Sequence, residues 1–473
     1  VTVDGTAHAP GTLTGTIAID APEAADGGNG LPVTTHLHED PRLGTEIEVV
    51  AQANSPNAPP VAASNGSTTL VVWADGAFRM QAALLAEDGT PSAPFSVRDV
   101  ECVDAECYSY AENAIGVASD GTDFLVVFRR WIEQRDGSRE TRTEYLNAVR
   151  ITAAGQILDP APIVLASQVQ SSSAAAGSYD RYFGGIRLAW DGAAYAVLWT
   201  NNDENGGNTD RTTAVVRRIG PAGQLLGSAV QVYPTPTTPV WQIVFSTIAC
   251  VAPDDCLVAW IEWDGLPSGP GTGFLRNALG VRVAGGQVVT SPPKILLNDC
   301  EYNDLDALRI AAHPTGYALV ALRQDCQNPA TECGYDLYAA LATADGTPVD
   351  PAGFRLNQPP GPGLAYARPV GLAFDGTQFL AAFFDLRTIE PIDFAKFWTA
   401  SANTGYQIFG TRFLPDGTVL DADPIGRLLQ PRPTSAGGRL VTTDSSFVLL
   451  WHDTRNTPPV NLRGVWAQRL FPH

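Results

Sequence analysis

Tyrosine, tryptophan, arginine and carboxylate residues recur in the polar segments that separate the apolar runs of this 473-residue chain. Aromatic rings stack on sugar faces and carboxylates hydrogen-bond to hydroxyl groups, so such segments could bind a glycan or a peptide. The same residue types also occur in ordinary solvated loops. We select as candidate ligand contacts Tyr110, Arg181, Tyr182, Trp241, Tyr302, Tyr366 and Arg368.

Two segments place possible metal ligands close together. Residues 201–210 include Asp203, Asn205 and Asp210, but their spacing departs from the EF-hand loop and the terminal glutamate is missing. His36 and His38 would share one side of an extended strand, and a metal would need a further ligand. A polar loop is the alternative for the first segment. We therefore predict no cofactor, and a calcium ion is the alternative.

Known catalytic motifs are absent from the sequence. There is no G-x-S-x-G nucleophile elbow, no P-loop, no glycine-rich dinucleotide motif and no Ser-x-Asp-x-Gly-x-x-Trp box of sialidases. His452 could act as a base, although anchoring a loop beside Asp453 is the simpler role. Paired carboxylates for glycoside cleavage depend on a spatial separation that sequence does not report. We assign no catalytic residue and favour a protein without enzymatic activity.

The seven cysteines indicate an oxidising compartment. Zinc sites are disfavoured, because C-x2-C spacing is absent and no histidine lies near a cysteine pair. We predict disulfides within three close pairs and leave Cys300 free, with a Cys300–Cys326 bond as the alternative. The pairs are Cys102 with Cys107, Cys250 with Cys256, and Cys326 with Cys333.

An internal repeat of about 60 residues must position these groups. Each copy contains a tight turn and then an apolar strand, as in SDGTDFLVVF, WDGAAYAVLW and FDGTQFLAAF. A second turn follows later in the copy, as in AEDG, TAAG and LPDG, where glycine supplies the positive φ of a short hairpin. Seven copies with period-2 alternation predict an all-β fold, a seven-bladed β-propeller of four-stranded antiparallel blades.

The two ends of the repeat array complement each other. The seventh copy stops after its third strand, at residues 462–470, and the orphan strand 45–52 (TEIEVVAQ) precedes the first copy. Pairing them would complete the last blade and remove an open sheet edge. We therefore predict a propeller over residues 43–473, closed by this N-terminal strand, and an arm over residues 1–42 that is poorly ordered or lies along the propeller's side.

The repeat resembles that of secreted bacterial propeller-repeat proteins, which carry V-V-W-x-D-x-R, then G-x-R, then D-G. LLWHDTR at 449–455, followed by Arg463 and Gly464, matches this pattern, as does FFDLR at 383–387, followed by Gly410, Thr411 and Arg412. The resemblance spans roughly residues 43–473, but the D-x-R element is lost in repeats two to five. It implies the fold and, since most such proteins have no assigned activity, little about function.

The bulk composition limits the partners. A formal net charge of −20 argues against nucleic acid and against anionic lipid, which both require a cationic surface. No apolar run is long enough to span a membrane. The chain begins with Val1, so we expect a product whose signal segment has been removed, located outside the cell, at its surface or in the periplasm.

The long connections of the predicted blades leave from one end of the propeller, which we call the loop face. They join strands two and three and connect one blade to the next, for example at 129–142, 200–211, 261–273 and 385–405. Variable loops on a rigid scaffold carry function, and the selected residues lie where connections enter first strands. Packing between blades is the alternative for them. We expect a non-catalytic module that binds a glycan or an extracellular protein; the alternatives are a secreted polysaccharide lyase or glycoside hydrolase and a structural subunit of an extracellular assembly.

Overall fold

The computed structural model describes the parts of the chain that form the blades. All elements assigned within them are β-strands, as the repeat predicted. The described residues are 12–16, 32–36, 42–51, 60–74, 79–98, 106–108, 115–136, 139–173, 181–203, 211–233, 241–264, 274–298, 305–328, 332–357, 367–385, 406–421, 427–434, 438–453 and 464–471.

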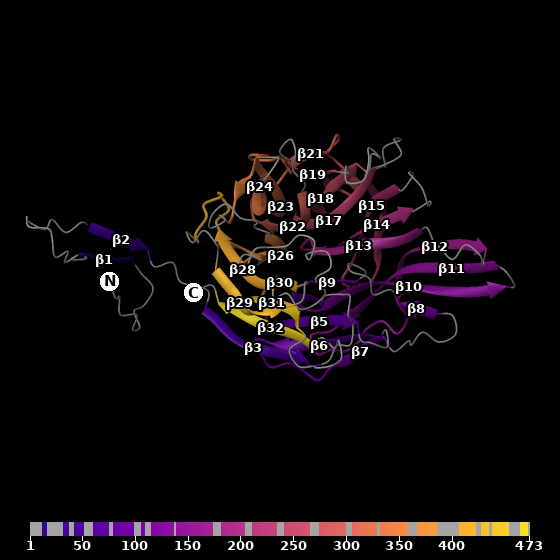
Figure 1. The fold of residues 1–473 in the computed structure, drawn as a ribbon. Helices are drawn as coiled ribbons and strands as arrows, with labels where there is room; N and C mark the ends of the chain where they lie inside the picture. The colour runs from indigo at the N-terminus through magenta and orange to yellow at the C-terminus, as the bar shows by residue number, and fades with distance from the viewer. Residues whose placement is uncertain are drawn as a thin grey trace, which may run out of the picture.

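Seven antiparallel sheets surround a central axis, and each is one blade of a β-propeller (Figure 1). The innermost strand of every blade contacts that of the next blade, and blade 7 contacts blade 1. The ring is therefore closed, which confirms the predicted seven-bladed fold. The innermost strands of blades 1 to 7 are β4 (Val61–Ser64), β9 (Ile115–Ser119), β13 (Arg181–Trp190), β17 (Trp241–Ala252), β22 (Leu305–His313), β26 (Ala367–Phe374) and β30 (Gly438–Thr442).

The remaining strands follow in order toward the outside of each blade. The second strands are β5 (Thr68–Ala74), β10 (Phe124–Asp136), β14 (Tyr195–Asp203), β18 (Asp255–Asp264), β23 (Gly316–Asn328), β27 (Phe379–Asp385) and β31 (Phe447–Asp453). The third strands are β6 (Met80–Ala86), β11 (Arg139–Ile151), β15 (Arg211–Ile219), β19 (Phe274–Ala284), β24 (Glu332–Thr343), β28 (Tyr406–Phe413) and β32 (Gly464–Phe471).

The outer strands vary most in length, and in blade 4 two short strands share this position. They are β7 (Phe95–Arg98), β12 (Ile163–Ser173), β16 (Leu225–Tyr233), β20 (Gln287–Val288) with β21 (Lys294–Leu297), β25 (Phe354–Arg355), β29 (Arg427–Thr434) and, in blade 7, β3 (Arg42–Val50).

Blade 7 joins the two ends of the chain, as predicted from the orphan strand. Strand β3 pairs antiparallel with β32, from Arg42 opposite Phe471 to Val50 opposite Val465. The Gln468 side chain adds a hydrogen bond from Nε2 to the carbonyl of Gly44, at 2.9 Å. This pairing covers the edge that β32 would otherwise expose.

Among the described residues, the core consists of seven hydrophobic clusters, and each lies between two neighbouring blades. Second strands are apolar on both faces, because each face packs against a different blade. In β10, for example, Val126 packs toward blade 1 and Val127 toward blade 3. Second-turn glycines also pack between blades, except Gly286 of blade 4, where a Cβ would meet nothing within 4 Å. A Cβ on Gly155, whose φ is +80°, would lie 3.2 Å from Phe95 of blade 1.

Arginine–aspartate pairs fasten the second turns of two blades, half-buried in blade 2 and buried in blade 6. In blade 2, Asp159 accepts hydrogen bonds from the backbone N–H of Arg150 at 2.7 Å and from its guanidinium. In blade 6, Asp421 accepts the same bonds from Arg412, at 2.7 Å from the backbone and 3.0 Å from Nη2. Both pairs span nine residues. The arginine of the G-x-R element therefore closes the third-to-fourth strand hairpin in blade 6.

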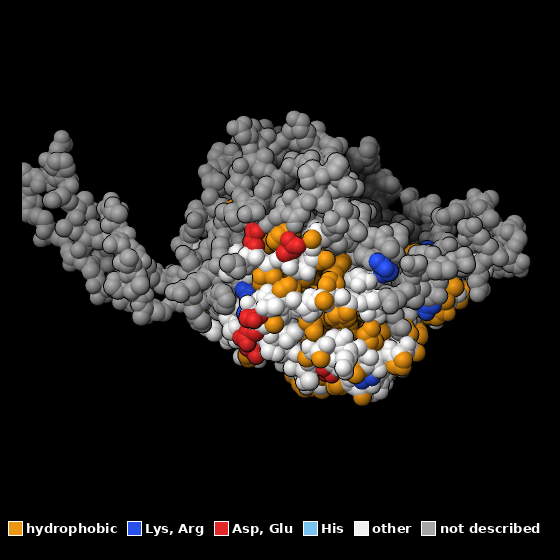
Figure 2. Space-filling model, turned by 90° about the horizontal axis from the view of Figure 1, so that it is seen from below, with side chains coloured by type: hydrophobic (Ala, Val, Ile, Leu, Met, Phe, Trp, Pro, Cys, Tyr) orange, Lys and Arg blue, Asp and Glu red, His pale blue; other side chains and the backbone are white. Residues whose placement is uncertain are grey.

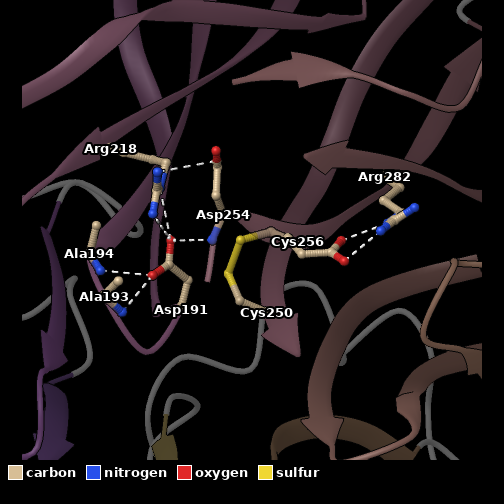
Figure 3. Close-up of a disulfide and its surroundings, with 9 residues drawn as sticks. Asp191, Ala193, Ala194, Arg218, Cys250, Asp254, Cys256 and Arg282 are labelled. Carbon is tan, nitrogen blue, oxygen red and sulfur yellow. Dashed lines mark hydrogen bonds and ion pairs between the residues drawn. A yellow bond between two sulfur atoms is a disulfide. The ribbon is translucent and has the colours of Figure 1, made fainter. Parts of the chain in front are cut away.

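The Cys250–Cys256 disulfide links β17 and β18 across their turn, as the spacing predicted (Figure 3). The neighbouring Asp254 N–H donates to Asp191 of blade 3, which also binds Arg218 at 2.6 Å. Cys326 and Cys333 face each other in the pairing of β23 with β24, and Cys107 lies in β8 (Glu106–Tyr108). Cys102 and Cys300 lie outside the described residues.

Blade 2 differs from the expectation of an irregular loop at 129–142. Strands β10 and β11 continue in unbroken register to Asp136 opposite Arg139, and β8 and β12 extend the sheet on both sides. These four strands project beyond the ring (Figure 1). The expectation was wrong because the strands of a free-standing hairpin carry polar residues on both faces. They therefore lack the apolar pattern by which a core strand is recognised in a sequence. We call this projecting sheet the blade 2 extension.

The N-terminal segment contains a hairpin of its own. Strand β1 (Thr12–Thr16) pairs with β2 (Pro32–His36), and neither pairs with a blade. His38 lies outside the described residues. The described part of the chain contains no helix long and apolar enough to cross a membrane. On the face shown in Figure 2, apolar and neutral side chains predominate and acidic groups gather near its margin.

Candidate functional site

The described parts of the loop face contain a subset of the predicted contacts. Tyr182 is the second residue of β13, and its side chain is half-buried. The backbones of Arg181, Trp241 and Arg368 lie at the starts of β13, β17 and β26, as expected for residues that enter first strands. Asp203 ends β14. Outside the described residues lie Tyr110, Tyr302, Tyr366, Asn205 and Asp210.

A buried ion pair supports Tyr182 from the neighbouring blade. Arg129 of β10 and Glu144 of β11 approach to 3.1 Å between Nε and Oε1, and the Glu144 side chain is fully buried. Gln168 of β12 donates from Nε2 to Glu144 Oε2 at 2.6 Å. Three adjacent strands of blade 2 thus supply one polar group each to the same point.

This ion pair holds the backbone that follows Tyr182. The N–H of Phe183 donates to Glu144 Oε2 at 3.2 Å, and the carbonyl of Phe183 accepts from Arg129 Nη1 at 3.0 Å. The guanidinium also stacks on the Tyr182 ring, 5.4 Å from its centre. Blade 2 therefore fixes both the main chain and the side-chain position of the entry to β13.

Asn202 of β14 holds the same segment from within blade 3. Its Nδ2 lies 3.4 Å from the Tyr182 carbonyl and 3.2 Å from Thr200 Oγ1, while Oδ1 accepts from Thr212 at 3.1 Å. A Cβ at Gly184 would lie 2.8 Å from Nδ2 of Asn202, so a larger residue there would displace this amide. The position of Tyr182 therefore depends on two blades.

Burial dominates the electrostatics of the ion pair. Desolvation raises the pKa of Glu144, against the opposing effects of Arg129, Gln168 and the Phe183 N–H. Desolvation likewise lowers the pKa of Arg129, and the charge of Glu144 opposes this shift. Because Glu144 is shielded from solvent and committed to these partners, the geometry favours a positioning role over proton transfer.

A second buried carboxylate lies between blades 3 and 4. Glu262 of β18 faces Tyr233 of β16, and burial raises the pKa of both side chains. The Trp260 indole and the Tyr233 hydroxyl favour the ionised form of Glu262. The same i, i+2 arrangement occurs in blade 3, where Trp199 Nε1 donates to Asn201 Oδ1 at 2.9 Å. In blade 3 the residue two positions after the strand-two tryptophan therefore accepts a hydrogen bond from the indole.

The first strands of blades 3, 4 and 5 share a bulge below the loop face. Their registers shift by one residue opposite the second strand, and the first bulge residue has a positive φ. It is Gly185 (φ 58°), Phe245 (φ 51°) and Ala307 (φ 55°). Bulges re-aim the residues beyond them, and left-handed phenylalanine and alanine are strained. The bulges therefore direct the entries of three consecutive blades, including those that carry Tyr182 and Trp241.

Sequence reasoning missed Arg129, Glu144 and Gln168. A charged residue at the centre of a strand, such as Glu144 in TEYLNAV, was the available signal. Within the described residues, no three histidine, cysteine or acidic side chains come together to hold a metal ion.

No family model and no curated protein matches this sequence. Among solved structures, the polysaccharide lyase Uly1 is similar with a TM-score of 0.52 and 9% identity, covering 91% of this chain and 100% of that chain. A lectin from Burkholderia pseudomallei, BP39L, has a TM-score of 0.45 and 13% identity, covering 88% of this chain and 96% of its own. The likeness to Uly1 shows a shared fold, and the lectin is too dissimilar to argue from. The chain is a seven-bladed β-propeller.

Proposed function

We propose that this protein is an extracellular β-propeller that binds a glycan through its loop face without cleaving it. The observation that carries the proposal is the position of Tyr182, which two blades hold rigidly while its ring stays half-buried. An aromatic ring that is already fixed loses little side-chain entropy when a ligand stacks on it. A rigid ring is therefore suited to binding a sugar face.

Two further features support the proposal. The buried carboxylate at the site is committed to structural hydrogen bonds, which leaves it poorly placed for catalysis. The Cys250–Cys256 disulfide fits an oxidising, extracellular compartment. From their places in the sequence, we expect the residues that precede or begin the first strands of blades 4 to 6 to extend the same loop face: Trp241, Tyr302, Tyr366 and Arg368.

A glycan array with the purified full-length chain tests the function. We expect saturable binding without release of reducing ends or unsaturated products. Tyr182→Ala should weaken binding about 10- to 30-fold, as at an aromatic hot spot, and Tyr182→Phe should retain most of it. Val169→Ala is the control, because Val169 is exposed on β12, the outer strand of the neighbouring blade 2.

Three outcomes would overturn parts of the proposal. Product release would establish the catalytic alternative, a lyase or a hydrolase. Unchanged affinity of Tyr182→Ala, with normal affinity of the control, would move the site elsewhere on the propeller. Absence of binding to every glycan, with capture of an extracellular protein instead, would replace the glycan with a protein partner.

A further inference from the structure

The outer edge of the blade 2 extension is formed by a long, regular strand. Among the described strands, β12 pairs with β11 alone and ends the order of strands in this sheet. From Ala166 to Ser173 it pairs with Leu146 to Arg139 without a register shift. The backbone N–H and C=O groups along such an edge can pair with a further extended chain.

The outer strands of the other blades carry features that hinder such pairing. Strand β29 contains two prolines and two arginines, β3 contains two glutamates, and two register shifts interrupt β16 around Gly227, whose φ is +61°. The strands β7, β20, β21 and β25 have at most four residues each. In contrast, β12 has eleven residues and contains no charged residue, proline or glycine. Charges, prolines and bulges are the usual protection of an edge strand, so β12 is a candidate site of strand pairing.

The extension is locally neutral on a strongly acidic protein. The formal net charge of the chain is −20, whereas residues 106–108, 129–144 and 163–173 together contain five arginines and five carboxylates. The register of the hairpin places carboxylates directly across from arginines, at Glu133 and Arg142, Arg135 and Glu140, and Asp136 and Arg139. Two copies of an acidic chain repel each other less where the local charge is balanced. A second copy of this chain can therefore approach at the extension.

The regular part of the β12 edge has its midpoint near Val169. It begins after Leu165, whose carbonyl accepts a hydrogen bond from Nη1 of Arg217 in blade 3 at 2.6 Å. The Val169 side chain is 63% exposed. Thr143 lies opposite Val169 and also opposite Ile132, so the three form a row on the sheet face that does not carry Glu144. Pairing at this edge would bury an exposed apolar side chain at the end of the row.

We propose that two copies of this chain form a dimer by antiparallel pairing of β12 with β12, about a two-fold axis at Val169. Directly opposite residues of an antiparallel pair lie on the same face, so the axis places Val169 opposite the same residue of the second copy. Ser167 then lies opposite Ser171, and Gln168 opposite Gln170, so no like charges meet. Because the extension projects beyond the ring, antiparallel pairing places the two rings at opposite ends of the shared sheet (Figure 1).

Sedimentation equilibrium of the full-length chain tests the dimer. The chain has a mass of 50.1 kDa, and we expect a species of twice this mass. Its dissociation constant should be about 10 µM, since a contact of two strands is small. Added salt should strengthen the dimer, because salt screens the repulsion between two acidic chains and the paired strands contain no charge. A chain that stays monomeric at about 200 µM would overturn the proposal.

Charge variants of Val169 test the location of the contact. Val169→Lys and Val169→Glu should each weaken the dimer about 10-fold, because like charges would meet at the axis. An equimolar mixture of the two should recover most of the dimer, since opposite charges then meet, and this recovery requires both variants to be folded. Two variants should remain dimeric: Val349→Lys, the same change at a 65% exposed valine of blade 5, and Val169→Ala, which adds no charge.

The remaining outcomes would place the contact elsewhere. Equal effects of Val169→Lys and Val349→Lys would overturn the pairing of β12. A mixture of the lysine and glutamate variants that stays monomeric, although each has the unfolding temperature of the wild type, would overturn the two-fold axis at Val169. A dimer that persists in Val169→Lys but is lost on deletion of residues 1–41 would assign the contact to the hairpin of β1 and β2 instead.

Discussion

Replacing Glu144 with alanine should destabilise the fold by about 3–5 kcal/mol, the usual result of removing one partner of a buried ion pair. The structure indicates a loss of stability in the upper part of this range. The Glu144 side chain is 0% exposed and that of Arg129 only 11%, so water does not replace the lost carboxylate. Gln168 and the Phe183 N–H would lose their acceptor at the same time.

Urea unfolding of the full chain, combined with hydrogen exchange of the peptide that contains Phe183, measures the effect. Exchange is needed because a propeller of this size need not unfold in one step, and the loss should appear first at the junction of blades 2 and 3. A double variant, Arg129→Met with Glu144→Leu, should recover most of the stability, since it buries no unpaired charge. A loss below 1 kcal/mol for Glu144→Ala, or no recovery in the double variant, would refute the buried-pair argument.

Three further predictions concern closure, protonation and the disulfide. Deleting residues 1–51 should give aggregated or loosened protein, because β32 loses its partner, whereas a chain lacking only 1–41 should keep one sharp thermal transition; identical unfolding of the two would disprove the closure. The raised pKa of Glu262 means that its carboxyl stabilises the fold below about pH 4.5, the ordinary value, and that this stabilisation is lost as the pH rises through the folded-state pKa. Glu262→Gln should therefore raise the unfolding temperature at pH 7 but not at pH 4, and an equal gain at both would contradict the assignment. Replacing Cys250 and Cys256 with alanine should cost at most about 2 kcal/mol in thermal or urea unfolding, since the bridge spans only 6 residues; recovery of Cys250 as a free thiol in non-reducing peptide maps would exclude the bridge.

Repetition made the fold predictable. Each copy repeats the same turn chemistry, and Asp191 shows why: its carboxylate accepts the N–H groups of Ala193 and Ala194 at 2.8 and 2.7 Å within its turn. Seven similar signals reinforce one another, and the orphan strand was recognisable because it had no partner within its own copy. Local chemistry thus determines the blades and their number.

The site was less predictable, because its contacts join distant residues. Tyr182 was found from its place at the entry of a first strand, but the groups that hold the adjacent Phe183 backbone are 39 and 54 residues away from Phe183, at Glu144 and Arg129. The contact of Gln168 with Glu144 depends in turn on the register of β11 with β12, which shifts between Leu146 and Asn147. No local pattern reports such a register shift. The blade 2 extension was missed for a related reason, since its strands contain charged residues on both faces.

The direction of pairing in blade 7 determines how the ring responds to force. Because β3 and β32 are antiparallel and Arg42 lies opposite Phe471, the chain leaves both strands at the same end of the ladder of hydrogen bonds. Tension applied between the two ends would therefore load these bonds one at a time, from the Arg42 end toward Val50, rather than all together in shear. We infer that a propeller tethered at both ends would open at blade 7 by unzipping, while its other six blades, each built from continuous chain, remained folded.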